Sequence, residues 1–250
     1  MPPPKRVPQT DAIFEQLSRV NPRADGAPDT LRLSLDAKAA VNVGPFSRRG
    51  KSRTKTEAAD HDFKPEATLT PFGILLTGYD ELMLYMTGSK VTSDFIVDRL
   101  EDWWEFNRVR FPEVTKLVLN LDNGPENHSR RTQFLKRIVE FARKFGLEVQ
   151  LAYYPPYHSK YNPIERCWGI LEMHWNGSLL DSIEAVVGFA RSMTWKGKHP
   201  VVSVVETTYA TGVKLTPEEM KALESQVARL PSLEKWFVEI PAGPRRVPDD

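Results

Sequence analysis

Cysteine is nearly absent from this chain: Cys167 is the only one among 250 residues. A single cysteine excludes a disulfide within the chain, which agrees with a reducing compartment, and we expect a buried helix thiol rather than a catalytic one. The five histidines show no pairs at the spacing of a zinc site. Thiol catalysis and zinc binding are therefore not the functions that this sequence favours.

Long apolar runs are also missing. No stretch approaches the roughly 20 apolar residues that a membrane-spanning helix needs, and the opening MPPPKRVPQT lacks the apolar core of a signal peptide. The composition, 40% hydrophobic and 27% charged, is ordinary for a globular protein in water. We therefore expect a cytoplasmic protein with no membrane partner.

An excess of charge of one sign is the third absence. The formal net charge is +1, whereas a dedicated nucleic-acid binder usually has a basic excess. Positive charge is concentrated locally, in a segment without helical or strand periodicity. Residues 46–55 read FSRRGKSRTK and contain Arg48, Arg49, Lys51, Arg53 and Lys55. We expect this loop to be a solvated face or, beside a catalytic site, a contact for DNA phosphates.

The order of apolar patterns predicts an α/β chain. Six of the first 30 residues are prolines, which predicts an extended arm with only a short helix-like piece around residues 13–17. Apolar runs predict strands, the first two of them neighbours, over residues 31–36, 40–44, 73–78, 82–87, 116–122 and 148–154. Helical spacing predicts helices over residues 92–107, 130–145, 163–175, 181–194 and 216–229. This order predicts a mixed sheet covered by helices.

Two of the predicted strands end in an aspartate. Asp36 closes the first strand, and Asp122 closes the buried-type strand KLVLNLD. Ligands of α/β sheets bind at strand ends, so parallel neighbours would bring these two carboxylates side by side. The alternative is that both aspartates only form turns, which the following Asn123-Gly124 favours for Asp122.

A third acidic residue, Glu165, lies in the stretch YPPYHSKYNPIERCWG (residues 154–169). Its immediate context, NPIE, fits a helix start with an N-cap, a proline at N1 and a capping-box glutamate at N3. Capping alone would explain this glutamate. However, Pro155 and Pro156 stiffen the approach and fix where the helix begins, which a carboxylate that binds a metal requires.

Three carboxylates from separate segments, Asp36, Asp122 and Glu165, suit magnesium, which prefers oxygen ligands. A pair of such ions can activate the attacking oxygen and stabilise the leaving oxygen in phosphodiester chemistry. Glu126 and Glu172 are further acids close in sequence. They are the alternatives if one of the three is misassigned.

Three long stretches resemble the catalytic region of the Rhodopirellula-type transposases, the ISAzo class of bacterial insertion sequences: SLDAKAAVNVGPFSRRGKSR, LVLNLDNGPENHSRRTQF and LAYYPPYHSKYNPIERCWGILE. The Asn-Pro-Ile-Glu arrangement is also similar to that of mariner-like transposases. The resemblance implies a ribonuclease-H-like fold, a mixed sheet flanked by helices. It also implies an Asp-Asp-Glu metal triad at Asp36, Asp122 and Glu165, two Mg²⁺ ions with Mn²⁺ as a substitute, and DNA as the substrate.

We expect the chain to have three parts. They are a proline-rich N-terminal arm (residues 1–30), a ribonuclease-H-like catalytic domain (31–200) and a C-terminal helical extension with a tail (201–250). Transposases of this kind normally carry an N-terminal DNA-binding region. Because only about thirty proline-rich residues precede the first predicted strand, we expect a catalytic fragment.

Beside such a triad, further basic residues become candidate DNA contacts. His128, Arg130 and Arg131 stand near a predicted helix start, where positive charge opposes the helix dipole and a bound phosphate would reverse that cost. His158 and Lys160 precede Glu165 in the loop, where they either contact the DNA backbone or lie on a plain surface.

Tryptophans offer a different choice, between core packing and base stacking. Trp168 and Trp175 share a helical stripe with apolar neighbours, which predicts core positions. Trp103 and Trp104 are adjacent, so one of them is expected at an interface.

The leading hypothesis is a transposase catalytic domain that cleaves DNA at the ends of an insertion sequence and joins the freed 3′ hydroxyl to target DNA. Two alternatives stay open: a ribonuclease-H-like nuclease that cuts without joining, and an inactive remnant that only binds DNA or a partner transposase. The expected partners are DNA, at the element ends and the target, and further copies of the chain. The expected location is the nucleoid.

Overall fold

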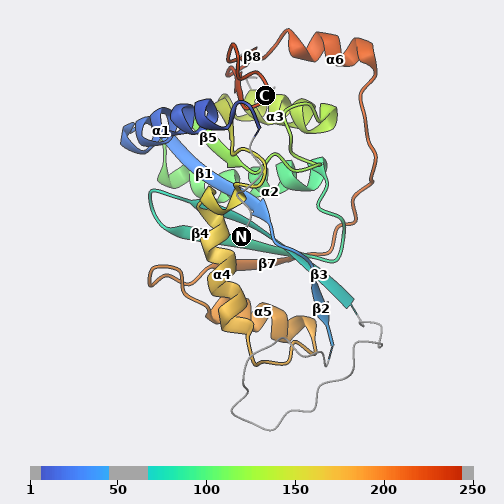
Figure 1. Cartoon of the computed structure of the whole chain (residues 1–250). Coiled ribbons are helices and arrows are strands. Elements are labelled where there is room, and N and C mark those ends of the chain that lie inside the picture. The colour runs from blue at the N-terminus through green and yellow to red at the C-terminus, as the bar shows by residue number, and fades with distance from the viewer. Residues whose placement is uncertain (1–6, 45–66, 244–250) are drawn as a thin grey trace.

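The computed structural model describes residues 7–44 and 67–243, and Figure 1 shows a central sheet with helices packed against it. The predicted basic contacts Arg48, Arg49, Lys51, Arg53 and Lys55 lie outside the described residues. Within the described ranges, none of the helices has the length and apolar character that crossing a membrane requires.

The described strands form one sheet in the order β7-β4-β3-β1-β5-β6-β9-β8, with β2 paired to β3. Their bounds are β1 (Thr30–Ala37), β2 (Val41–Val43), β3 (Ala67–Leu76), β4 (Glu81–Thr87), β5 (Lys116–Leu121), β6 (Glu148–Tyr153), β7 (Val201–Val205), β8 (Ala228–Arg229) and β9 (Phe237–Ile240). β3 is antiparallel to both β1 and β4, whereas β5 and β6 run parallel to β1. This mixed sheet confirms the predicted ribonuclease-H-like fold class. The prediction that β1 and β2 are neighbours in the sheet is wrong. Both strands pair with β3 instead.

Six helices lie in the described part of the chain. Their bounds are α1 (Thr10–Gly26), α2 (Ser93–Asn107), α3 (Thr132–Phe145), α4 (Ile164–Trp175), α5 (Ile183–Ser192) and α6 (Pro217–Glu224). The predicted end of α3 is confirmed, because Gly146 takes the left-handed conformation (φ +66°) of a glycine cap. Trp103 and Trp104 are both buried in the core, so the interface position expected for one of them is wrong.

The two faces of the sheet are covered by different helices. Phe72 of β3 contacts the ring of Phe95 in α2, with ring centroids 5.5 Å apart. The next residue, Gly73, points to the opposite face, where Ile164 and Trp168 of α4 pack against it. Consequently α2 lies on one face and α4 on the other, and Figure 1 shows α4 crossing the strands.

Residues 10–26 form α1 and not the extended arm that the prolines predicted. Its inward side chains recur at helical spacing and are buried: Ile13, Leu17, Val20 and Ala24. Pro22 removes a backbone hydrogen bond inside the helix at a cost of about 3 kcal/mol. Burying large apolar side chains gains about 1.5–3 kcal/mol each, so the apolar stripe outweighs the proline.

The described part of the segment 201–250, residues 201–243, is not the helical extension that was predicted. β7 pairs in parallel with β4, and β9 pairs antiparallel with β6, so both belong to the central sheet. The valine-rich run of β7 is a β-branched pattern that favours a strand. Helix α6 begins with a capping box of Thr216 and Glu219, but it ends at Glu224, before β8 and short of the predicted end at residue 229.

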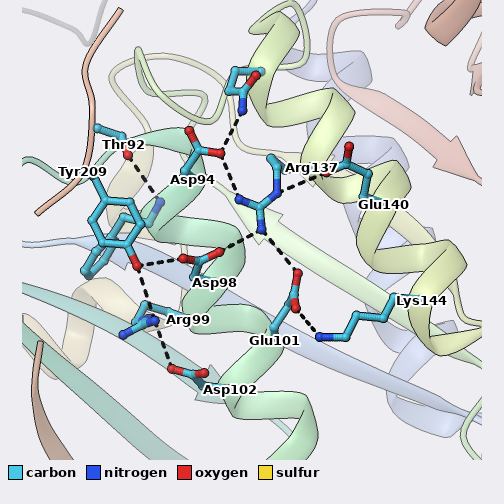
Figure 2. Close-up of polar contacts among 12 residues, drawn as sticks. Thr92, Asp94, Asp98, Arg99, Glu101, Asp102, Arg137, Glu140, Lys144 and Tyr209 are labelled. Carbon is cyan, nitrogen blue, oxygen red and sulfur yellow. Dashed lines mark hydrogen bonds and ion pairs between the residues drawn. The ribbon is translucent and has the colours of Figure 1, made fainter. Parts of the chain in front are cut away.

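Helices α2 and α3 are joined by Arg137 of α3 (Figure 2). Its guanidinium contacts four carboxylates at 2.8–3.3 Å: Asp94, Asp98, Glu101 and Glu140. Lys144 adds a contact of 2.6 Å to Glu101. The hydroxyl of Tyr209 donates to Asp98 at 2.8 Å and ties the segment after β7 to the same group. We call these residues the Arg137 cluster, in which each acidic side chain faces a cation.

Candidate active site

Asp36 and Asp122 lie side by side at the carboxyl ends of adjacent strands. β1 and β5 are parallel, and their last registered pair is Ser34 with Asn120. Asp36 lies two residues beyond Ser34, and Asp122 two residues beyond Asn120. The prediction that parallel neighbours bring these carboxylates together is confirmed. The Asp36 side chain is buried, with 8% of the residue exposed.

The three predicted carboxylates interact electrostatically. Burial raises the pKa of Asp36 to about 7, together with the negative charges of Asp122 and Glu165. A hydrogen bond from Trp168 opposes this rise. In the described part of the chain, none of the three carboxylates forms an ion pair with arginine or lysine. Asp36 therefore lies in a negative environment that described cations do not neutralise.

Asp122 also forms the turn that was its alternative role. One of its carboxylate oxygens, Oδ1, accepts from the backbone N–H of Gly124 at 3.1 Å and from the side-chain amide of Asn127 at 2.9 Å. The backbone carbonyl of Asn127 accepts from the buried hydroxyl of Tyr153 at 2.6 Å. Because Asn127 is fixed at both ends, it holds Asp122 in one orientation.

Glu165 is not used to cap its helix. α4 begins without a side-chain cap, so the predicted capping box at residues 162–165 is absent. Asn162 instead accepts from Ser34 Oγ at 2.6 Å and donates to the carbonyl of Leu35 at 3.2 Å. Ser34 Oγ in turn accepts from the backbone N–H of Ile164 at 3.0 Å. The helix start is thus bonded to β1, and the carboxylate of Glu165 is left for another role.

Trp168 connects α4 to the first aspartate. Its indole Nε1–H donates to Asp36 Oδ2 at 2.8 Å. The predicted core position of Trp168 is confirmed, since only 5% of it is exposed, but this polar contact was not among the predictions. Glu165 and Trp168 are three residues apart and so lie on the same side of the helix. α4 therefore presents both side chains toward β1.

These carboxylates fit a divalent ion by their chemistry. Mg²⁺ and Mn²⁺ prefer carboxylate oxygens, and a cation beside Asp36 would remove the repulsion that raises its pKa. Among the described residues, no three His, Cys, Asp or Glu side chains are already gathered closely enough to form a metal-binding group. The donor set is therefore suited to an ion, while the final ligand geometry would form on binding.

The two alternative acids have other partners. Glu126 forms an ion pair with Arg131 at 3.1 Å and accepts from Ser93, and Glu172 forms an ion pair with Lys38 at 2.8 Å. Each is held by a cation, in contrast to Asp36, Asp122 and Glu165, none of which forms an ion pair with a described arginine or lysine. The structure gives no reason to exchange them for a member of that group.

The basic residues around α3 differ in their exposure. Arg130 is exposed and directly precedes the helix, whereas Arg131 is its N-cap residue and pairs with Glu126. Burial and the positive charge of Arg131 lower the pKa of His128, whose Nδ1 accepts from the backbone N–H of Arg130 at 3.2 Å. Of these three predicted contacts, only Arg130 presents an exposed, uncommitted charge.

The two basic residues predicted as DNA contacts in the loop before α4 differ in their exposure. Lys160 is exposed, with its ammonium 5.2 Å from the centre of the Tyr161 ring. His158 is 5% exposed, packs against the ring of Phe14 in α1, and bonds the carbonyl of Pro156 through Nδ1 at 2.8 Å. Neither role predicted for His158, a DNA contact or a surface position, matches this burial. It packs the loop against α1, a helix that the sequence reasoning did not foresee.

Four residues that shape the site were missed by sequence reasoning: Ser34, Asn127, Asn162 and Trp168. A weak signal existed for two of them. Ser34 lies two residues before Asp36 on the polar side of an alternating strand, and Trp168 lies three residues after Glu165. Asn127 and Asn162 resembled ordinary turn and cap residues, and only their tertiary partners show otherwise.

The strand order and the helices on both faces place the protein in the ribonuclease-H-like class, which includes polynucleotidyl transferases and nucleases. The comparison with protein families shows to which family within that class the chain belongs. The chain belongs to the family of the Rhodopirellula transposase DDE domain, which matches residues 2–242. The resemblance noted in the sequence is thereby confirmed.

Solved structures similar to this chain include complexes of the Mos1 transposase. The paired-end complex with left transposon end has a TM-score of 0.49 and 14% identity, covering 74% of this chain and 56% of that one. The Mos1 mariner paired-end complex with Mn has a TM-score of 0.47 and 14% identity, covering 73% and 54%. This chain thus spans about half the length of those proteins. No curated protein matches it.

Proposed function

We propose that this chain is a transposase catalytic domain that cleaves DNA at the ends of an insertion sequence and joins the freed strand to target DNA. The observation that most supports the proposal is the placement of Asp36 and Asp122 at the ends of adjacent parallel strands, with the charge of Glu165 acting on Asp36 from the start of α4. Membership of a transposase DDE domain family supports the reaction class.

In this proposal Asp36, Asp122 and Glu165 hold two Mg²⁺ ions, with Mn²⁺ as a substitute. Ions bound to carboxylates activate the attacking oxygen and stabilise the leaving oxygen of a phosphodiester. The chain contributes the position of each ligand. Burial keeps bulk water from Asp36, and Asn127 fixes one oxygen of Asp122.

The DNA contacts in this proposal are charges near the carboxylates. Arg130 and Lys160 are exposed just before α3 and α4, where each phosphate that they neutralise adds a salt-dependent increment of affinity. The basic residues 48–55 would add to this contact. His128, with its lowered pKa, would contribute hydrogen bonds rather than charge near pH 7. DNA as the partner would place the protein at the nucleoid.

Incubation of the purified chain with labelled element-end DNA and Mg²⁺ tests the proposal. We expect cleaved DNA, and joined products when target DNA is added. Loss of both products in Glu165→Gln, with DNA binding retained, would support metal-dependent catalysis by this site.

Other outcomes separate the alternatives. Cleavage without joined products would indicate a nuclease. Binding without turnover, in both Mg²⁺ and Mn²⁺, would indicate an inactive remnant and contradict the proposal. Gel filtration with and without element-end DNA would show whether copies of the chain assemble on it.

A further inference from the structure

The orientation of Asp36 is set by a side chain from another element. Trp168 Nε1–H donates to Asp36 Oδ2 at 2.8 Å, and both residues are buried. A buried hydrogen bond to one oxygen restricts the rotation of the carboxylate and leaves Oδ1 for a different partner. Groups that hold a metal-binding side chain in this way tune the affinity of the site.

The start of α4 is held on β1 by a second pair of buried residues. Ser34 and Asn162 are both fully buried, and their side chains are bonded at 2.6 Å. Ser34 Oγ also accepts from the N–H of Ile164 and thereby replaces the missing N-cap. Asp36 lies two residues after Ser34, and Glu165 three residues after Asn162. This contact therefore sets the position of one carboxylate-bearing segment relative to the other.

The backbone of β3 leaves the space that this contact needs. Gly73 is registered opposite Asp36, and a Cβ atom at Gly73 would lie 2.7 Å from Ile164 and 2.8 Å from Trp168. Those distances are too short for real carbon atoms, so α4 approaches the sheet this closely only because residue 73 has no side chain. The close approach brings the indole within reach of Asp36.

We infer that Trp168, Ser34 and Asn162 are positioning residues for the divalent ions of the proposed function, on which this inference rests. Trp168 fixes the carboxylate of Asp36, and the Ser34–Asn162 pair fixes the start of α4. Together they hold the helix start that carries Glu165 against the strand that carries Asp36 before an ion binds. They act through the ligands and do not touch the ions or the DNA.

Direct measurement of Mn²⁺ affinity, by electron paramagnetic resonance on the full chain without DNA, tests the inference. Trp168→Phe keeps an aromatic ring but removes the N–H, and we expect it to weaken Mn²⁺ binding by about 10- to 100-fold. Trp175→Phe is the matched control, because Trp175 lies in the same helix and apolar cluster, about two turns away. It is expected to bind Mn²⁺ as the wild type does, even if its melting temperature falls equally.

A second variant and a rescue complete the experiment. Ser34→Ala removes a single oxygen and is also expected to weaken Mn²⁺ binding, and it carries the test if Trp168→Phe does not fold. Because the defect concerns affinity, a saturating Mn²⁺ concentration should restore DNA cleavage by Trp168→Phe.

The failure of the inference differs from the failure of the proposed function. Wild-type Mn²⁺ affinity in both Trp168→Phe and Ser34→Ala would overturn the positioning role while the proposed function stands. No Mn²⁺ binding by the wild-type chain would overturn both.

Discussion

Two groups of acidic side chains in this protein lie in opposite surroundings. In the Arg137 cluster, four carboxylates surround one guanidinium between α2 and α3, and Lys144 adds a second cation (Figure 2). At the ends of β1 and β5 and the start of α4, the negative charges of Asp122 and Glu165 act on Asp36, and no described arginine or lysine pairs with the three carboxylates.

The difference indicates which group is structural and which is functional. Carboxylates that face a cation gain from the fold and stabilise it, whereas a buried carboxylate beside other negative charges costs stability. Such a cost persists where an added charge is needed for function, and in the proposed function that charge is a divalent ion. The pKa of about 7 at Asp36 is the sign of that cost. Helix α2 is also rich in acidic residues, but its carboxylates in the Arg137 cluster already face a cation and need no metal ion.

The largest expected effect separates the two groups by activity. Glu165→Gln keeps the size of the side chain but removes its charge, and we expect DNA cleavage to fall by roughly 10³-fold or more, as when one member of a group that acts as a unit is lost. Glu140→Gln makes the same chemical change in the Arg137 cluster and should leave cleavage nearly unchanged. Equal losses in both variants, measured with labelled element-end DNA, would remove the distinction.

The second prediction concerns the stability of the metal-free chain. The pKa of Asp36 is raised in the folded state, from 3.8 to about 7, so the folded protein holds a proton that the unfolded chain releases. The resulting stability is complete below about pH 4 and is lost as the pH rises toward 7, on the order of 4 kcal/mol in total. Urea unfolding of the wild type and Asp36→Asn isolates this contribution. Parallel pH profiles for the two proteins would contradict it.

A smaller loss of stability is expected from a substitution in the Arg137 cluster. Arg137→Met leaves the carboxylates of the Arg137 cluster without their central cation, and we expect the free energy of unfolding to fall by about 2–3 kcal/mol at pH 7. The loss should shrink at high salt, because dissolved ions screen the attraction between the guanidinium and these carboxylates. Thermal unfolding at low and high salt measures it, and an equal loss at both would indicate packing rather than charge.

The smallest predicted effect comes from the edge of the same cluster. Tyr209→Phe removes one hydroxyl, which donates to Asp98 at 2.8 Å, and should cost about 1 kcal/mol of unfolding free energy. Chemical denaturation provides the value. A loss near that of Arg137→Met would mean that Tyr209, and not the guanidinium, holds the cluster together.

Much of the fold could be predicted because local patterns and tertiary packing agree. The buried strands β5 and β6 and the amphipathic helix α3 follow directly from apolar spacing, and Gly146 marks the end of α3. α1 could not be predicted in the same way, since Pro22 disfavours a helix locally and only packing against the sheet compensates for it. Local propensity and tertiary burial disagree there, and burial decides.

The carboxylates of the candidate site could be proposed from the sequence, but the side chains that position them could not. Strand ends and a rigid loop are visible in the sequence, so Asp36, Asp122 and Glu165 could be proposed together. The sequence of NPIE, however, fits a capping box, and only the contact of Asn162 with Ser34, 128 residues away, shows why Glu165 does not cap. The burial of His158 likewise depends on Phe14, from a helix far away in the chain.

A crystal of this protein soaked in Mn²⁺ offers the most direct test of the central claim, that Asp36, Asp122 and Glu165 form an uncompensated site for divalent ions. We predict anomalous density between these three carboxylates and none in the Arg137 cluster. Mn²⁺ bound to other acidic side chains, with these three carboxylates left empty, would contradict the account.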